Sequence, residues 1–212
     1  MDRDEIWRAV DAGRAAFADE LESLTDGEWE RPSRCPGWTV RHVAAHVISS
    51  PQAGLSRMAV AMWRARGDFN RCVRDEAIRW GARPPTEIVA DYRRLAGSRR
   101  TPPGVTPDVA LLDVLVHTSD ALDPLDRHRP MPPAAAAVAA DRVWRRSFPF
   151  RARERLRGVR LIATDVPWTA GSGAPVTGPI EPLLLVLTGR SDGVCGLSGD
   201  GVETLRDRIT QR

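Results

Sequence analysis

Asp113 and His117 lie four residues apart in a stretch of sequence that is otherwise apolar. In a helix this spacing places both side chains on one face, one turn apart. Burying a carboxylate in an apolar helix is costly unless it is paired or bound to a cation. Two interpretations follow: a hydrogen-bonded ion pair between the two residues, or a metal site. Asp120, three residues further on, either orients His117 through the other ring nitrogen or is a solvated helix residue.

His46 favours the metal site. It adjoins the apolar stripe of another predicted helix, which also carries His42 one turn earlier. Helical bundles assemble metal sites from side chains on facing helices. Together, His46, Asp113 and His117 provide two imidazoles and one carboxylate, a three-ligand set with open positions. This set suits a divalent ion, with zinc the first expectation and iron, nickel or manganese as alternatives.

The elements that must position these residues follow from apolar periodicity and from capping residues. Thr39 and Thr106 are the expected N-caps of the two helices that carry the site. Residues 68–85 are expected to form a loop with a short helical piece. The predicted helices span residues 4–24, 40–63 with an interruption near Pro51, 86–96, 107–123 and 133–144.

The sequence changes character after about Phe150. Residues 159–164 and the segment around Trp168 are typical of strands, and residues 171–173 of a tight turn. An apolar helix over 180–187 and a short last helix follow. The expected fold class is therefore α+β, with an N-terminal up-down helical bundle over residues 1–150 and a small α/β domain over residues 151–212.

Residues 31–47, which read RPSRCPGWTVRHVAAHV, resemble the opening motif of the mycothiol-dependent maleylpyruvate isomerase family. That family belongs to the DinB-like metal-binding bundles, and His46 matches its metal-binding histidine. Asp113, His117 and Asp120 match a later motif, although the isomerases have Glu at the first position. The shorter Asp113 side chain requires a closer helix or a bridging water. Segments 168–173, 178–179, 184–190 and 197–201 resemble the family's sterol-carrier-like second domain.

The resemblance implies a function and further site residues. The family uses mycothiol as a thiol cosubstrate, so we expect an isomerase or a thiol S-transferase in which a metal-bound thiolate attacks a small electrophile. Arg190 resembles a family arginine that faces the active-site cleft, where it would bind a substrate carboxylate; alternatively it caps the preceding helix. Trp38 either lines the cleft, close to the cosubstrate, or belongs to the core.

The amino-acid composition of the chain narrows the classes of binding partner and the cellular location that we expect. All 31 basic residues are Arg, but acidic residues are interspersed and the net charge is only +3, so nucleic-acid binding is not expected. The charged N-terminus and the absence of a long apolar run indicate neither a signal peptide nor a membrane span. Three separated cysteines predict reduced thiols in the cytoplasm, with Cys35 either a bystander or a reactive group near the site. Monomer and homodimer stay open, as do a non-catalytic binding or sensing protein and a purely structural bundle.

Overall fold

The computed structural model describes residues 1–102 and 104–210. Its contacts divide the chain into an N-terminal unit, Asp2–Arg129, and a C-terminal unit, Pro130–Arg212 with Met1. The division falls before the expected boundary at residue 150 because α8 (Pro133–Arg145) packs on α10 (Ile180–Leu187) in the C-terminal unit. The buried face of α8 is mostly alanine, which lets the apolar α10 approach closely.

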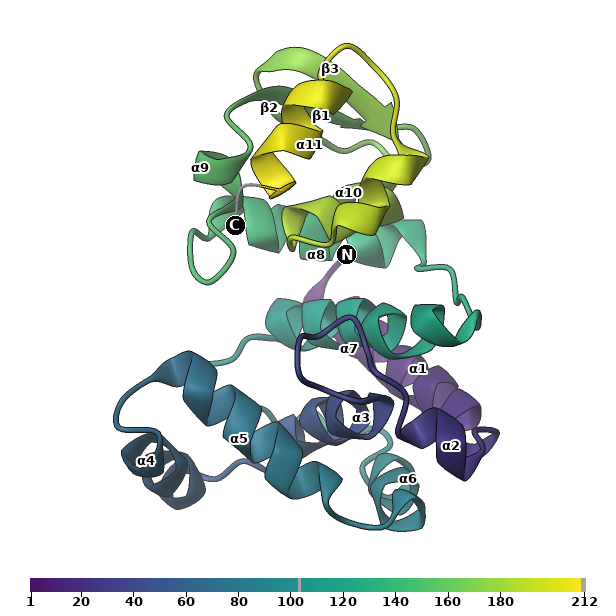
Figure 1. Cartoon of the computed structure of the whole chain (residues 1–212), viewed down its shortest axis with the longest axis vertical. Helices are drawn as coiled ribbons and strands as arrows, with labels where there is room; N and C mark the ends of the chain where they lie inside the picture. The colour runs from purple at the N-terminus through teal and green to yellow at the C-terminus, as the bar shows by residue number, and fades with distance from the viewer. Residues whose placement is uncertain (103, 211–212) are drawn as a thin grey trace. The chain divides into compact units, whose positions relative to one another are not determined.

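The described part of the N-terminal unit is helical (Figure 1). Two of its helices begin where the sequence predicts, with Thr39 as the N-cap of α3 and Thr106 as the N-cap of α7. The elements are α1 (Arg3–Glu22), α2 (Asp26–Trp29), α3 (Val40–Ser49), the 3-10 turn η1 (Ser50–Gln52), α4 (Leu55–Arg64), α5 (Phe69–Gly81), α6 (Pro85–Arg94), α7 (Pro107–Leu122) and the 3-10 turn η2 (Asp123–Leu125).

Four helices pack in a ring in which α1 contacts α7, α7 contacts α3, α3 contacts α6, and α6 contacts α1. Gly13 permits the close approach of α1 to α7, since a Cβ there would meet Val114 at 3.2 Å. Tyr92 of α6 packs its ring edge against Phe17 of α1 and donates its hydroxyl to the carbonyl of Ala44 on α3, 2.9 Å away. This ring holds α3 and α7, the two helices that carry the site, side by side.

The expected interruption of the helix over residues 40–63 is present near Pro51, where the chain turns at η1 and begins a separate helix, α4. Pro51 lacks the amide hydrogen that would continue α3. The segment over residues 68–85, expected to be a loop with a short helical piece, is mostly helical. It contains α5, whose N-cap Asp68 accepts a hydrogen bond from the amide of Arg71. Only Ala77 and Gly81 of α5 are buried, so the helix has little apolar periodicity to reveal it.

The C-terminal unit is a small α/β structure with α8, α9 (Ala152–Arg155), α10, the 3-10 segment η3 (Ser191–Gly196) and α11 (Val202–Thr210). Its sheet has the order β2-β1-β3, formed by β1 (Gly158–Ala163), β2 (Thr169–Gly171) and β3 (Gly173–Gly178). Because β2 runs antiparallel and β3 parallel to β1, the chain crosses the start of β1 through Ser172 alone. This crossing requires Gly173, where a Cβ would lie 2.1 Å from the carbonyl oxygen of Gly158. The α+β class is confirmed.

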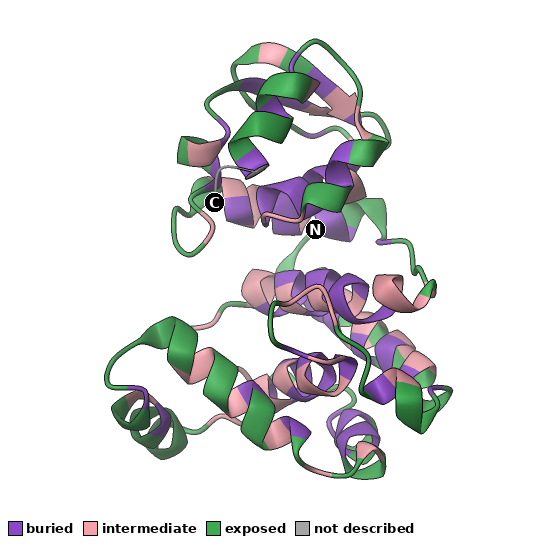
Figure 2. Ribbon diagram, viewed as in Figure 1, coloured by how far each residue is buried: buried purple, intermediate pink, exposed green. Residues whose placement is uncertain are grey.

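The helices of the N-terminal unit differ in how far they are buried (Figure 2). The ribbons of α3 and α7 are largely buried, whereas α4 is exposed along most of its length. Within residues 1–102 and 104–210, none of the helices combines the length and apolar character that crossing a membrane requires.

Candidate metal centre

His46 from α3 and the pair Asp113 and His117 from α7 converge in the N-terminal unit. One ligand atom from each of the three lies within 4.8 Å of the other two. Nε2 of His46 is 3.8 Å from Oδ2 of Asp113, and Nε2 of His117 is 3.8 Å from Oδ1 of the same carboxylate. The two imidazole rings are 5.0 Å apart between centroids and nearly perpendicular. The structure therefore brings together the three residues that the sequence proposes as ligands.

These distances bear on the two interpretations of Asp113. A hydrogen bond between an imidazole and a carboxylate requires about 2.7–3.2 Å, so neither histidine is hydrogen-bonded to Asp113. Donors around a tetrahedral zinc ion, each about 2.0–2.2 Å from the ion, lie roughly 3.4 Å apart. The observed 3.8 Å separations exceed this by only a few tenths of an ångström. The residues present fit a divalent ion better than a direct ion pair.

The other nitrogen of His117 already has a partner. Nδ1 lies 2.9 Å from Oδ2 of Asp120, whose side chain is completely buried. Asp120 is therefore not the solvated helix residue that the sequence left open. A carboxylate at Nδ1 fixes the tautomer in which Nε2 carries the lone pair, and this lone pair faces Asp113 and His46. A carboxylate bound to the second ring nitrogen is the arrangement commonly found for metal-binding histidines.

Cys35 extends this support. Its thiol donates to Oδ2 of Asp120 at 3.2 Å and lies 3.7 Å from Nδ1 of His117. Cys35, His117 and Asp120 form a second group whose ligand atoms lie within 4.8 Å of one another. We assign this group to hydrogen bonding and not to a metal, because the 2.9 Å between His117 and Asp120 is a hydrogen-bond distance.

The loop before α3 reaches α7 through its backbone as well. The amide of Arg34 donates to the carbonyl of Asp120 at 2.9 Å, and its guanidinium binds Ser119 and Asp123. Sequence reasoning did not assign a role to Arg34 and left Cys35 open. The only sequence feature that could have indicated these contacts is the Pro- and Gly-rich composition of the loop. Such a loop cannot be helical, so its residues can reach a neighbouring helix.

Trp38 lies beside the proposed ligands. Its ring centroid is 5.1 Å from that of His46 and 6.3 Å from that of His117, and only 8% of the residue is exposed. Trp38 thus belongs to the core and also borders the site. His42, one turn before His46, acts instead as a helix cap, because its Nδ1 accepts a hydrogen bond from the amide of Thr39 at 3.1 Å at the start of α3.

The two ligand histidines differ in their proton affinity. Burial lowers the pKa of His46 to about 4, against the opposing charge of Asp113, so its ring is neutral near pH 7. Burial also acts to lower the pKa of His117, but hydrogen bonds with Asp120 and Cys35 and the nearby carboxylate charges outweigh it and raise the pKa to about 10. Without an ion, therefore, His117 holds a proton, which a metal must displace.

Asp113 is more accessible than its apolar helix suggested. Its side chain is 33% exposed, against 19% for His46 and 16% for His117. Arg14 of α1, which is buried, interacts electrostatically with Asp113 and donates to the carbonyl of Ser98 at 3.1 Å. The expectation of a buried Asp113 is wrong, and the fully buried carboxylate is Asp120. Part of the Asp113 carboxylate is therefore accessible to solvent.

Arg190 lies in the C-terminal unit, between α10 and η3. Its guanidinium donates to the carbonyl of Thr188 at 2.8 Å, and its backbone amide donates to the carbonyl of Leu185. The capping contact that the sequence offered as an alternative is therefore present. This contact occupies part of the guanidinium and leaves its role towards substrate a prediction.

Comparisons with known proteins point in one direction. A family model described as "Mycothiol maleylpyruvate isomerase N-terminal domain" matches residues 10–176. Two solved structures share the fold, that of a mycothiol-dependent maleylpyruvate isomerase (TM-score 0.65, 15% identity) and that of a histidine-to-alanine mutant of such an enzyme (TM-score 0.64, 14% identity). Each match covers 94% of this chain and 93% of the other. No curated protein sequence matches the chain.

Proposed function

Because the chain belongs to the mycothiol maleylpyruvate isomerase family, as its motifs predicted, we propose that it is a metal-dependent enzyme with mycothiol as its cosubstrate. Its substrate would be a small electrophile, and its reaction an isomerisation or the transfer of the thiol. The observation that carries this proposal is the convergence of His46, Asp113 and His117, with Asp120 behind His117. Zinc is the ion that this donor set suits best.

Each residue around the proposed centre would have a distinct role in catalysis. A bound divalent cation would supply the positive charge that lowers the pKa of a thiol. His46, neutral because it is buried, offers a lone pair without first losing a proton. Asp120 holds His117 in the matching tautomer, and Asp113 would offset one of the two positive charges of a bound ion. Trp38 packs beside both rings and would limit the access of water from that side.

The proposed reaction starts from the thiolate of mycothiol, which adds to the electrophilic double bond and shifts its electron pair onto the conjugated carbonyl. In an isomerase, rotation about the new single bond and expulsion of the thiolate regenerate the cosubstrate. In a transferase the new carbon–sulfur bond persists and the product takes up a proton. Arg190 remains the proposed partner of a substrate carboxylate, so Arg190→Gln should raise KM several-fold and leave the metal content unchanged.

The test is turnover by the zinc-loaded protein. Mycothiol should be combined with maleylpyruvate to detect isomerisation, and with a panel of activated alkenes and alkyl halides to detect thiol consumption. We expect a rate that depends on both the metal and mycothiol and falls at least about a hundredfold in His46→Ala. Rates equal to those of His46→Ala for every substrate would reject the enzyme and favour a metal-dependent binding or sensing protein. A cytoplasmic location stays a prediction of the sequence, and monomer and homodimer both stay open.

A further inference from the structure

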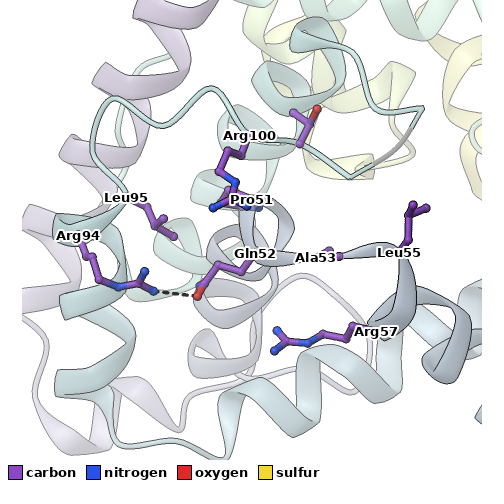
Figure 3. A pocket seen from close by; sticks show the side chains of 10 residues that line it. Pro51, Gln52, Ala53, Leu55, Arg57, Arg94, Leu95 and Arg100 are labelled. Carbon is purple, nitrogen blue, oxygen red and sulfur yellow. Dashed lines mark hydrogen bonds between the residues drawn. The ribbon is translucent and has the colours of Figure 1, made fainter.

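A second site is suggested by a cavity of about 420 Å³ in the N-terminal unit (Figure 3). It lies where η1 meets the start of α4, beside the end of α6 and residues 100–101. Small-molecule sites usually measure about 300–1,000 Å³, so the size is suitable. None of the proposed metal ligands lines it. The lining residues are Pro51, Gln52, Ala53, Gly54, Leu55, Arg57, Arg94, Leu95, Arg100 and Thr101.

The charge of the lining is of one sign. It includes Arg57, Arg94 and Arg100 and no carboxylate. Figure 3 shows these three side chains entering from different sides, with Arg94 directed at Gln52, whose Oε1 accepts its hydrogen bond at 2.8 Å. Three guanidinium groups around one hollow repel one another, and an anion in the hollow would relieve that repulsion.

Two of the three charges have no counter-charge within residues 1–102 and 104–210. The guanidinium of Arg100 makes no hydrogen bond or ion pair with the residues that the structure describes. Among those residues Arg57 has a single side-chain partner, the ring of Trp80, with 5.0 Å between its guanidinium carbon and the ring centroid. Arg94 is partly neutralised by Asp91, 2.7 Å away, but Asp91 also binds Arg83 at 2.7 Å.

Neighbouring arginines differ in this respect. Arg99, directly before Arg100, pairs with Asp4 at 2.7 Å, and Arg93, directly before Arg94, pairs with Asp19 at 2.6 Å. These two neighbours are thus paired with carboxylates, whereas Arg57 and Arg100 are not paired with any carboxylate that the structure describes. Arg57 and Arg100 therefore place two uncompensated charges beside one cavity.

The remaining lining is apolar or small. Pro51 and Leu95 are buried and form a hydrophobic part of the wall, next to Ala53. A guanidinium binds a carboxylate or a phosphate through two parallel hydrogen bonds. We propose that this cavity binds a small organic polyanion, which has a short carbon body and at least two carboxylate or phosphate groups. The site is independent of the metal centre and of the proposed reaction.

Titration calorimetry on the full-length, metal-free protein tests this proposal. The probes are citrate, glycerol 1,3-bisphosphate and, as a monoanion, acetate, all at one ionic strength. We expect one site for citrate or the bisphosphate with a Kd below about 1 mM, and binding of acetate at least tenfold weaker. The preferred polyanion identifies whether carboxylate or phosphate groups are recognised.

Matched variants locate the binding. Arg57→Gln and Arg100→Gln remove guanidinium groups that hold no carboxylate, so their melting temperatures should equal that of the wild type. Each should weaken polyanion binding about tenfold, whereas Arg64→Gln, an exposed arginine of α4 outside the lining, should have no effect. Absence of binding by either polyanion up to about 10 mM, or equal binding by all three variants, would overturn the proposal.

Discussion

Nδ1 of His117 lies 2.9 Å from Oδ2 of Asp120, and the Asp120 side chain is fully buried. The other nitrogen of the same ring faces Asp113, whose side chain is one-third exposed. The two carboxylates on α7 therefore differ in role: the buried one holds the imidazole, and the accessible one is available to an ion. His117 is thus fixed on its Nδ1 side by a buried carboxylate, whereas the Asp113 side of the proposed centre is accessible to solvent.

Asp120→Asn tests whether the buried carboxylate of Asp120 supports His117 as a metal ligand. The amide keeps the size of the side chain but loses the charge that fixes the His117 tautomer. Loss of such a supporting group typically lowers metal affinity about 10–100-fold, and we expect a loss of that size. Competition with a chromophoric chelator measures it. Asp126→Asn, an exposed substitution after η2, is the matched control. Equal zinc affinities for all three proteins would show that Asp120 does not support His117.

His117→Ala should destabilise the metal-free protein. The substitution removes the imidazole that pairs with the buried Asp120 carboxylate, and breaking a buried ion pair by removing one partner costs about 3 kcal/mol or more. Adding Asp120→Asn in the same chain should restore part of this loss, since it removes the charge. Urea unfolding in the presence of a chelator measures the free energy of unfolding. His128→Ala, which breaks an exposed ion pair with Asp123, should cost less than about 1 kcal/mol. Unfolding of His117→Ala at the wild-type urea concentration would show that Asp120 does not depend on the imidazole.

The stability of the metal-free protein should pass through a maximum near pH 6.5. The folded pKa of His46, about 4, is below its ordinary 6.5, so its contribution is present above pH 6.5 and is lost as the pH falls towards 4. The folded pKa of His117, about 10, is above 6.5, so its contribution is complete below pH 6.5 and is lost as the pH rises towards 10. Each limb has a slope of at most about 1.4 kcal/mol per pH unit.

Substituting each histidine in turn shows which one causes the acid limb and which the alkaline limb of the pH–stability profile. His46→Gln should flatten the acid limb and His117→Gln the alkaline limb, as measured by urea unfolding across the pH range. If His117→Gln leaves the alkaline limb unchanged, the high proton affinity of His117 is refuted.

The sequence predicted the helices that carry the site because their caps and apolar faces are local features. Thr39 and Thr106 cap α3 and α7, and the spacing of Asp113 and His117 is a property of one helix. The exposure of Asp113 was mispredicted, because it depends on which neighbours cover α7. The contact of Cys35 with Asp120 joins residues 85 apart, and no local pattern encodes it. The helix α5 was predicted only as a short helical piece because it buries few apolar side chains.

Cys35→Ala should weaken zinc binding several-fold, since it removes a thiol that donates to Asp120. Cys35→Ser keeps a donor at this position and should bind zinc nearly as the wild type does. Cys72→Ala on α5 serves as the control for loss of a half-buried thiol. The same chelator competition measures all three affinities. A serine variant as weak as the alanine variant would indicate that packing, and not hydrogen bonding, is what Cys35 provides.

The most direct test is calorimetric titration of zinc into chelator-treated protein. We predict about one equivalent of zinc per chain, with release of close to one proton near pH 8, because zinc displaces the proton of His117. His46→Ala and His117→Ala should each abolish this binding, and His128→Ala should keep it. Uptake of less than about a tenth of an equivalent by the wild type, or full uptake by His46→Ala, would contradict the assignment of His46, Asp113 and His117 as the metal centre.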